Sequence, residues 1–159
     1  MAIDGVTTCL WFDEQAEEAA QFYVATFPDS QILSTSYYAT DAQKPEDSVL
    51  TMEFELFGKA FLALSGGPHF THSPAISFQV FCDTQEEVDR LWNALVSDGG
   101  EESMCGWCGD RFGVSWQIIP RRLTELLSSP DADVARRTTE RMMTMNKIVI
   151  AGLEWPLTA

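Results

Sequence analysis

Two stretches of this sequence resemble each other closely enough to decide its fold. Residues 12–29 read FDEQAEEAAQFYVATFPD, and residues 81–98 read FCDTQEEVDRLWNALVSD. When the chain is shifted by 69 residues, from 12 to 81, the paired glutamates, one alanine and the final aspartate coincide. Apolar residues follow the spacing i, i+3, i+4 in both stretches, so each predicts an amphipathic helix. Thr84 and Glu87 predict a capping box at the start of the second helix.

A second match follows each predicted helix. FGKAFLAL (57–64) aligns with FGVSWQII (112–119) at a shift of 55 residues, from 57 to 112. Both copies begin with an apolar run, so each reads strand, helix and then further strands. The expected strands are VTTCLWF (6–12), QILSTSYYA (31–39), SVLTMEFEL (48–56) and KAFLALS (59–65) in the first copy. In the second copy they are AISFQVF (75–81), a short run near ESMCGW (102–107), a middle strand whose bounds the pattern does not fix, and SWQIIP (115–120). The pattern predicts an α+β fold built from two β-α-β-β-β units.

A single domain of 159 residues accommodates both units. We place the first unit at about residues 5–67 and the second at about 74–120. Helical patterns at 123–129 and 131–145 predict a helical C-terminal extension from about 121 to 159.

Charge and hydropathy exclude several classes of protein. The formal net charge is −14, and a nucleic-acid backbone would be repelled, so no nucleic-acid partner is expected. No apolar run of about 20 residues is present, so no membrane partner is expected. The start, MAIDGVTTCLWF, lacks the basic and apolar regions of a signal peptide. These features predict a cytoplasmic protein whose four cysteines are thiols.

Longer stretches carry a resemblance to a known family. CLWFDEQAEEAAQFYVATFPDSQI (9–32), MEFELFGKAFLALSGGP (52–68), DRFGVSWQIIP (110–120) and ERMMTMNKIVIAGLE (140–154) resemble PhnB-like proteins, often labelled demethylubiquinone methyltransferases. That group is similar to glyoxalase I, extradiol dioxygenases and bleomycin-resistance proteins, which form the vicinal oxygen chelate superfamily. The resemblance implies that each unit curls into a half-barrel, and that the two concave faces enclose a ligand site.

The resemblance also implies a homodimer, because members of this superfamily commonly pair. The C-terminal extension offers apolar surface that would contribute to such a dimer, unless it packs on its own domain. The residues concerned are Leu123, Leu126, Leu127, Met142 and Met143.

Glyoxalase-like relatives imply one His or Glu ligand on the first and last strand of each unit, around a divalent metal. Matching the turns brings these positions onto Thr8 or Cys9, Leu62, Ile76 or Ser77, and Gln117. None of these residues is His or Glu, so we expect no metal and no cofactor. The methyltransferase label finds no motif to support it, because no G-x-G-x-x-G turn follows the strand at 6–12.

Strand alternation predicts which side chains line the pocket. Apolar residues such as Val80 and Trp116 would pack against the helices, and their neighbours along each strand would face the ligand. The expected ligand-binding residues are Thr8, Leu10, Glu53, Leu62, Ser77, Gln79, Ser115 and Gln117. Gln79, Gln117 and Glu53 would orient an uncharged or cationic ligand. Alternatively, the two glutamines would bond to each other or to a partner chain.

A mixed apolar and polar wall is typical of a small-molecule pocket. We therefore expect the protein to bind a small organic molecule without a metal. The alternative is an enzyme of the superfamily: glyoxalase-like, dioxygenase-like, or a methyltransferase as the label suggests. The sequence identifies neither the ligand nor a catalytic residue.

A C-x-x-C motif, Cys105 and Cys108, follows the second predicted helix. Three readings are open: two unpaired thiols, a reversible disulfide, or a zinc site completed by His69 and His72. The motif leads into a strand turn instead of a helix, so no helix N-terminus lowers the pKa of the leading thiol. This context favours the unpaired thiols.

Overall fold

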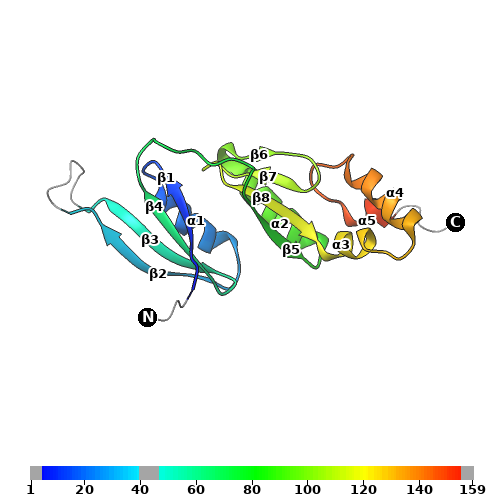
Figure 1. The fold of residues 1–159 in the computed structure, drawn as a ribbon, viewed down its shortest axis with the longest axis horizontal. Coiled ribbons are helices and arrows are strands. Elements are labelled where there is room, and N and C mark those ends of the chain that lie inside the picture. The colour runs from blue at the N-terminus through cyan, green and yellow to red at the C-terminus, as the bar shows by residue number, and fades with distance from the viewer. Residues whose placement is uncertain (1–4, 40–46, 155–159) are drawn as a thin grey trace. The chain divides into compact units, whose positions relative to one another are not determined.

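The computed structural model describes residues 5–39 and 47–154. The chain divides into two compact units, Met1–Thr71 and His72–Ala159, which we describe one at a time. Each unit contains a four-stranded mixed sheet with a helix against it, and three further helices follow the second sheet (Figure 1). The α+β fold of two β-α-β-β-β units with a helical extension is thereby confirmed. Within the described ranges, no helix is both long enough and apolar enough to cross a membrane.

The first unit runs β1 (Thr8–Phe12), α1 (Ala16–Thr26), β2 (Ser30–Tyr37), β3 (Val49–Leu56) and β4 (Lys59–Ser65). The strand order is β1-β4-β3-β2, with β1 parallel to β4. Three alanines of α1 are fully buried, which brings the helix close to the sheet. Tyr23 of α1 stacks on Phe54, and Phe54 stacks on Phe61, with ring centroids 5.9 and 5.2 Å apart. The sequence predicts a longer loop in the first copy near TDAQKPEDS (40–48), and most of that stretch lies outside the described residues.

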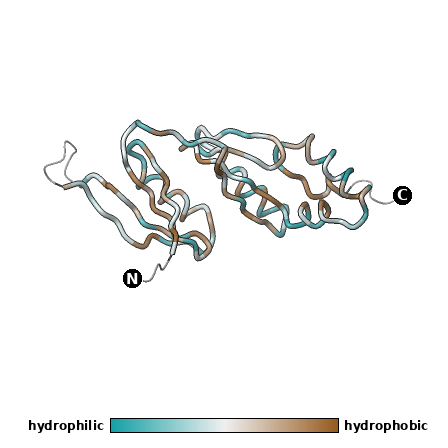
Figure 2. The backbone as a smooth tube through the Cα atoms, in the orientation of Figure 1, coloured by the Kyte–Doolittle hydropathy of each residue, from teal (hydrophilic) through white to brown (hydrophobic). Residues whose placement is uncertain are grey.

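The second unit repeats this order, with two strands that are much shorter than their counterparts. It runs β5 (Ser77–Cys82), α2 (Gln85–Val96), a 3-10 turn η1 (Ser97–Gly99), β6 (Glu101–Glu102), β7 (Trp107–Gly109) and β8 (Ser115–Pro120). The strand order is β5-β8-β7-β6, with β5 parallel to β8. The predicted capping box is confirmed: Glu87 N–H donates to Thr84 Oγ1 and Thr84 N–H donates to Glu87 Oε2, both over 3.2 Å. Hydrophobic and hydrophilic residues alternate along the elements, as burial of one side requires (Figure 2).

The strand expected near residues 102–107 is interrupted. Only Glu101–Glu102 and Trp107–Gly109 are strands, and the residues between them form a turn. Cys105 and Gly106 both take left-handed backbone conformations, with φ of 60° and 83°, which ends the extended run. A Cβ on Gly106 would lie 2.9 Å from the Ile118 carbonyl oxygen, so this turn requires glycine.

The C-terminal extension forms α3 (Arg121–Leu127), α4 (Ala132–Met142) and α5 (Ile150–Glu154). It packs on the second sheet through one apolar cluster: Ile119, Leu123, Leu126, Ile148 and Leu153. The dimer surface expected from the sequence is therefore wrong for Leu123 and Leu126, which are buried within their own unit. Of the other three, Met142 packs against that cluster, whereas Leu127 and Met143 are exposed.

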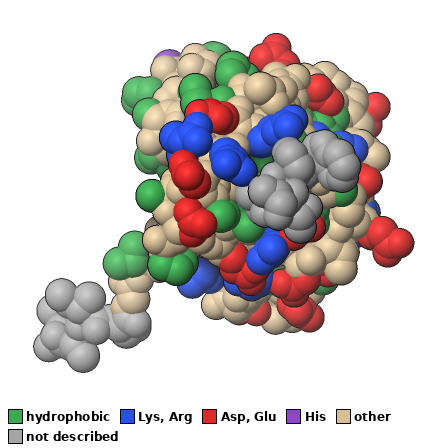
Figure 3. All heavy atoms as spheres, turned by 90° about the vertical axis from the view of Figure 1, so that its right-hand side faces the viewer, with side chains coloured by type: hydrophobic (Ala, Val, Ile, Leu, Met, Phe, Trp, Pro, Cys, Tyr) green, Lys and Arg blue, Asp and Glu red, His purple; other side chains and the backbone are tan. Residues whose placement is uncertain are grey.

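Backbone hydrogen bonds also fasten the extension. The N–H groups of Cys105 and Gly106 donate to the carbonyls of Met145 and Asn146, both over 2.7 Å. Gln85, at the start of α2, donates to the Ile148 carbonyl over 3.1 Å and accepts from the Ile150 N–H over 2.8 Å. On the outside of the extension, arginines and carboxylates lie next to one another (Figure 3), as in the pairs of Arg122 with Glu154 and Arg136 with Glu140.

Asp110 organises the turn between β7 and β8. Its carboxylate is almost completely buried and accepts three hydrogen bonds. Oδ1 accepts from the N–H groups of Phe112 and Val114, over 2.9 and 3.1 Å. Oδ2 accepts from Trp116 Nε1 over 2.8 Å. One side chain thus ties the turn to the indole of the central strand.

Replacing Asp110 with asparagine should lower the free energy of unfolding by roughly 2–4 kcal/mol. The amide is isosteric but carries one donor group, so either Trp116 N–H or the two backbone N–H groups would face another donor. The measurement is urea unfolding, and Asp98→Asn is the control, because Asp98 is an exposed aspartate 3.6 Å from Arg111. Equal losses in the two variants would contradict the assigned role of Asp110.

Candidate small-molecule site on the second sheet

Helix α2 covers one face of the second sheet. The covered side chains are buried, among them Val80, Trp116 and Ile118. The remaining positions of β5 and β8 form three neighbouring pairs on the opposite face, which we call the open face: Ser77 with Ser115, Gln79 with Gln117, and Phe81 with Ile119. The chemistry changes along these pairs, from hydroxyls through amides to apolar groups.

The two glutamines form a hydrogen-bonded chain with Ser77. Gln79 Nε2 donates to Gln117 Oε1 over 2.8 Å. Gln117 Nε2 in turn donates to Ser77 Oγ over 2.7 Å. Each amide nitrogen has two hydrogens and each oxygen two lone pairs, so these bonds leave donors and acceptors for a further group. The amides are held in place by each other while Gln79 stays exposed.

A hollow of about 430 Å³ lies over the amide and apolar pairs. Its floor is formed by Gln79, Phe81, Gln117 and Ile119, with Cys105 and Trp107 beside them. Its remaining lining comes from the C-terminal extension: Leu123, Thr124, Leu127, Ser128 and Met142. Among these lining residues, Cys105 has the one ionisable side chain. The hollow can therefore hold an uncharged molecule, but it offers no carboxylate, imidazole or amine for proton transfer.

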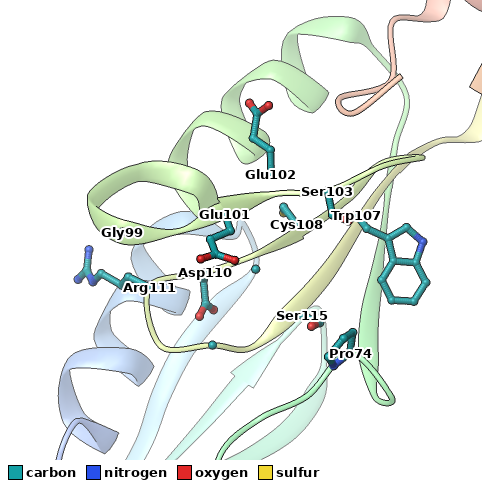
Figure 4. A pocket seen from close by; sticks show the side chains of 12 residues that line it. Pro74, Gly99, Glu101, Glu102, Ser103, Trp107, Cys108, Asp110, Arg111 and Ser115 are labelled. Carbon is teal, nitrogen blue, oxygen red and sulfur yellow. The ribbon is translucent and has the colours of Figure 1, made fainter. Parts of the chain in front are cut away.

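A second hollow, of about 480 Å³, lies around the other end of β7 and β8 (Figure 4). Glu101, Glu102 and Asp110 line it, but the carboxylates of Glu102 and Asp110 already accept hydrogen bonds from other side chains. Asp110 accepts the three bonds described above, and Glu102 accepts from Trp92 Nε1 over 2.9 Å. That bond and the neighbouring Asn146 amide lower the pKa of Glu102. Figure 4 shows the Glu102 side chain directed away from Asp110 and Ser115. Asp110 thus stabilises the turn between β7 and β8, whereas Glu102 binds the Trp92 indole of α2.

The predicted site residues of the second unit lie together. Ser77, Gln79, Ser115 and Gln117 all belong to the open face, as strand alternation indicated, although Ser115 is buried. Ser115 lines the second hollow, whereas the two glutamines line the first. The contact between the glutamines, one of the alternatives raised from the sequence, is present. Whether these residues bind a ligand stays a prediction.

In the first unit the predicted residues divide between two faces. Leu62 lies beside Glu53 on the face opposite α1, and Ser34 Oγ donates to Glu53 Oε2 over 2.9 Å. Leu10 lies on the helix side, next to fully buried Ala63, and is itself buried. The expectation that Thr8 and Leu10 share a face with Leu62 is therefore wrong. Cys9 is the residue that pairs with Leu62.

A shift of one residue explains this error. In the first sheet Phe12 pairs with Ser65, and in the second Cys82 pairs with Pro120. Ser65 and Pro120 are equivalent at the shift of 55, so the first strands are equivalent at a shift of 70, from 12 to 82. The shift of 69 that matches the helices is one residue short for the strands, and such a slip exchanges the two faces of a strand.

Sequence reasoning missed several residues around these faces. Trp107 lines both hollows, and alternation from Gly109 along β7 was the signal that could have found it. In the first unit, Trp11 occupies the open side of β1 and donates from Nε1 to the Gly67 carbonyl over 2.8 Å. Phe70 meets the Trp11 ring edge-on, with centroids 5.1 Å apart. No turn match pointed to these aromatic contacts.

The residues at the four turn-matched positions do not fit a divalent metal. Leu62 has no donor atom, and Gln117 supplies an amide already bonded to Gln79 and Ser77. In the part of the chain that the structure describes, no three His, Cys, Asp or Glu side chains gather as a metal site requires. His69 is exposed in its loop.

All four cysteines are free thiols. Burial raises the pKa of Cys108 to about 12, with help from the neighbouring Asp110 and Glu102 carboxylates. Burial likewise raises the pKa of Cys82 to about 11. Cys105 lies in the turn and lines the first hollow, so the two cysteines of the motif have different surroundings.

Iodoacetamide should modify Cys9 and Cys105 in the folded protein at pH 8 and leave Cys82 and Cys108 unmodified. A thiol with a pKa near 12 is a thiolate in about one molecule in ten thousand at that pH, and this fraction rises tenfold per pH unit. Mass spectrometry of the labelled peptides provides the readout, and urea-unfolded protein, labelled at all four sites, is the control. Rapid labelling of Cys108 in the folded state would contradict this assignment.

Most of this chain is similar in sequence to known proteins. A family model described as 3-demethylubiquinone-9 3-methyltransferase matches residues 4–119. A PhnB protein from Bacillus cereus, which carries the same methyltransferase name, is 34% identical over 74% of this chain and 99% of that protein, with a TM-score of 0.67. No match was found among curated proteins.

Two more distant structures show likeness of fold alone. A protein from Pseudomonas aeruginosa is 22% identical over 74% of this chain and 98% of its own, with a TM-score of 0.59. The fosfomycin resistance protein FosX from Mesorhizobium loti is 12% identical over 73% of this chain and 90% of its own, with a TM-score of 0.50.

Proposed function

This chain belongs to the 3-demethylubiquinone-9 3-methyltransferase family, the PhnB-like group of the glyoxalase and bleomycin-resistance superfamily, and we propose that it binds a small uncharged organic molecule on the open face of its second sheet. One observation carries the proposal: the pair Gln79 and Gln117 lies in the floor of an otherwise largely apolar hollow. Apolar walls with a few fixed polar groups are the usual form of a small-molecule site.

The chemistry of the hollow supports a neutral ligand with both a donor and an acceptor. An amide, a lactam or a similar group can bond to the free hydrogens and lone pairs of the two glutamines. A flat ring attached to that group would contact Trp107, Phe81 and Ile119. The net charge of −14 opposes the approach of anions. The ligand class we propose is therefore an uncharged aromatic or alicyclic molecule that bears an amide-like group.

An enzyme of the superfamily is the second candidate, and the family name specifies methyl transfer to a quinone. A quinone is uncharged and accepts hydrogen bonds, so it is compatible with the glutamines as donors. Methyl transfer also needs a methyl donor and a base that ionises the acceptor hydroxyl. The residues lining the first hollow include no carboxylate or histidine. Binding is thus better supported than catalysis.

Benzamide, as an uncharged aromatic amide, should bind and should be preferred over benzoate, which lacks the donor and is repelled. Gln117→Leu should weaken benzamide binding about 3- to 10-fold, because one net hydrogen bond is worth roughly 0.5–1.5 kcal/mol. Ligand-observed NMR titration measures the dissociation constants. Gln31→Leu is the matched control, since Gln31 is an exposed strand glutamine of the first unit. Unchanged affinity in Gln117→Leu would contradict the proposed role of the amides.

We also propose that the chain forms a homodimer, on the strength of its superfamily and of the exposed apolar residues Met143 and Val149 on the extension. Sedimentation velocity at micromolar concentration should show a species of twice 17.8 kDa. Met143→Glu should shift it toward the monomer, because a charge would be buried in the contact. A single 17.8 kDa species in the unmodified protein would contradict this proposal.

A further inference from the structure

We infer that the C-terminal extension forms the specificity wall of the ligand site, and that it selects molecules with an apolar substituent extending from the amide-bound ring toward α3 and α4. The inference rests on the proposed function, because it concerns the same hollow. It names the part of the ligand that the sheet residues alone do not contact. We call Leu127 and Met142 the apolar wall.

The extension lies beyond the residues that the family model matches. The family model ends at residue 119, one residue before the end of β8. The Bacillus cereus PhnB protein is matched over 99% of its length by 74% of this chain, so part of this chain has no counterpart in that protein. A hollow that includes residues from 121 onward therefore has lining that the family model does not describe.

The position of the wall follows from the backbone. Helix α3 begins at Arg121, directly after β8 ends at Pro120, so no loop separates the helix from the strand that carries Gln117 and Ile119. One side of α3 packs into the apolar cluster through Leu123 and Leu126. Because residues three and four apart share a helix face, Thr124, Leu127 and Ser128 lie together, and all three line the hollow.

The second half of the wall comes from α4. Met142, its last residue, lines the hollow and packs partly against the apolar cluster. The next residues of the chain are held firmly, because the Met145 and Asn146 carbonyls accept from the N–H groups of Cys105 and Gly106. Cys105 itself lines the same hollow. The extension is thus fixed at the edge of the site and acts as a wall with a set position.

The wall is apolar where the ligand would extend. Leu127 is 36% exposed, so its side chain has surface left to cover. Methionine is flexible and adapts to apolar groups of different shape. Thr124 and Ser128 place hydroxyls on the same helix face, where they tolerate water. A benzamide ring bonded to the glutamines would reach the floor, and an alkyl chain on the ring would reach Leu127 and Met142.

The test compares benzamide with 4-butylbenzamide on the full chain by ligand-observed NMR. The butyl compound should bind at least tenfold more tightly, because each fully buried CH₂ contributes about 0.8 kcal/mol and partial burial of four carbons suffices. Leu127→Ser and Met142→Ser should each reduce this butyl advantage, the ratio of the two dissociation constants, at least threefold. Leu33→Ser, a change at an exposed leucine of the first unit, should leave this ratio as it is.

The outcomes separate the two proposals. The wall is overturned if the butyl advantage persists in both Leu127→Ser and Met142→Ser, or if the unmodified protein shows no butyl advantage. In either case the proposed function still stands if Gln117→Leu weakens benzamide binding. A wall-dependent butyl advantage without any effect of Gln117→Leu supports the wall and overturns the amide role. Thermal melting of each variant identifies loss through unfolding, and Leu127, being partly exposed, provides the variant least prone to it.

Discussion

The buried carboxylate of Asp110 holds the strand on which the candidate site depends. Its three hydrogen bonds fix the turn into β8 and anchor the Trp116 indole beneath the sheet. β8 is an inner strand, bonded to β5 on one side and β7 on the other, so its register positions Gln117 next to Gln79. It also leads directly into α3. A buried carboxylate with three donors is strongly directional, and this one sets the orientation of both the floor and the wall of the first hollow.

Local chemistry made much of this fold predictable. Helical periodicity and the Thr84–Glu87 capping box located α2, and the Phe-Gly match at a shift of 55 placed Leu62 and Gln117 at equivalent positions of β4 and β8. The face of β1 was not predictable in the same way, because the helix match carried Phe12 onto Phe81 whereas the sheets equate Phe12 with Cys82. A helix tolerates a slip of one residue in its alignment more readily than a strand, where one residue reverses every side chain.

The C-x-x-C motif is the most conspicuous feature of the sequence, yet its two intervening residues form part of a tight backbone turn. Gly106, between the cysteines, permits a left-handed turn against β8. The N–H groups of Cys105 and Gly106 donate hydrogen bonds to carbonyls of the C-terminal extension. Cys108 then falls on the α2 side of the sheet and is buried. Motif spacing could not separate these uses, because a redox pair, a metal ligand pair and a tight turn all accommodate two residues between cysteines. The surrounding strands decide among them.

The two hollows of the second unit differ in the polar groups that line them. The resemblance implied metal-ligating His or Glu residues, but the second sheet has the glutamines Gln79 and Gln117 instead. They hydrogen-bond to each other and to Ser77, so these polar groups have partners even when no ligand is bound. Two of the carboxylates around the other hollow, those of Asp110 and Glu102, accept hydrogen bonds from Trp116 and Trp92. A site with neutral polar groups gains affinity mainly from apolar contact. The residues that the family model matches end at Ile119, at the apolar end of the open face, and the extension continues from there. Apolar contact with a ligand of the proposed kind would therefore be added at that end.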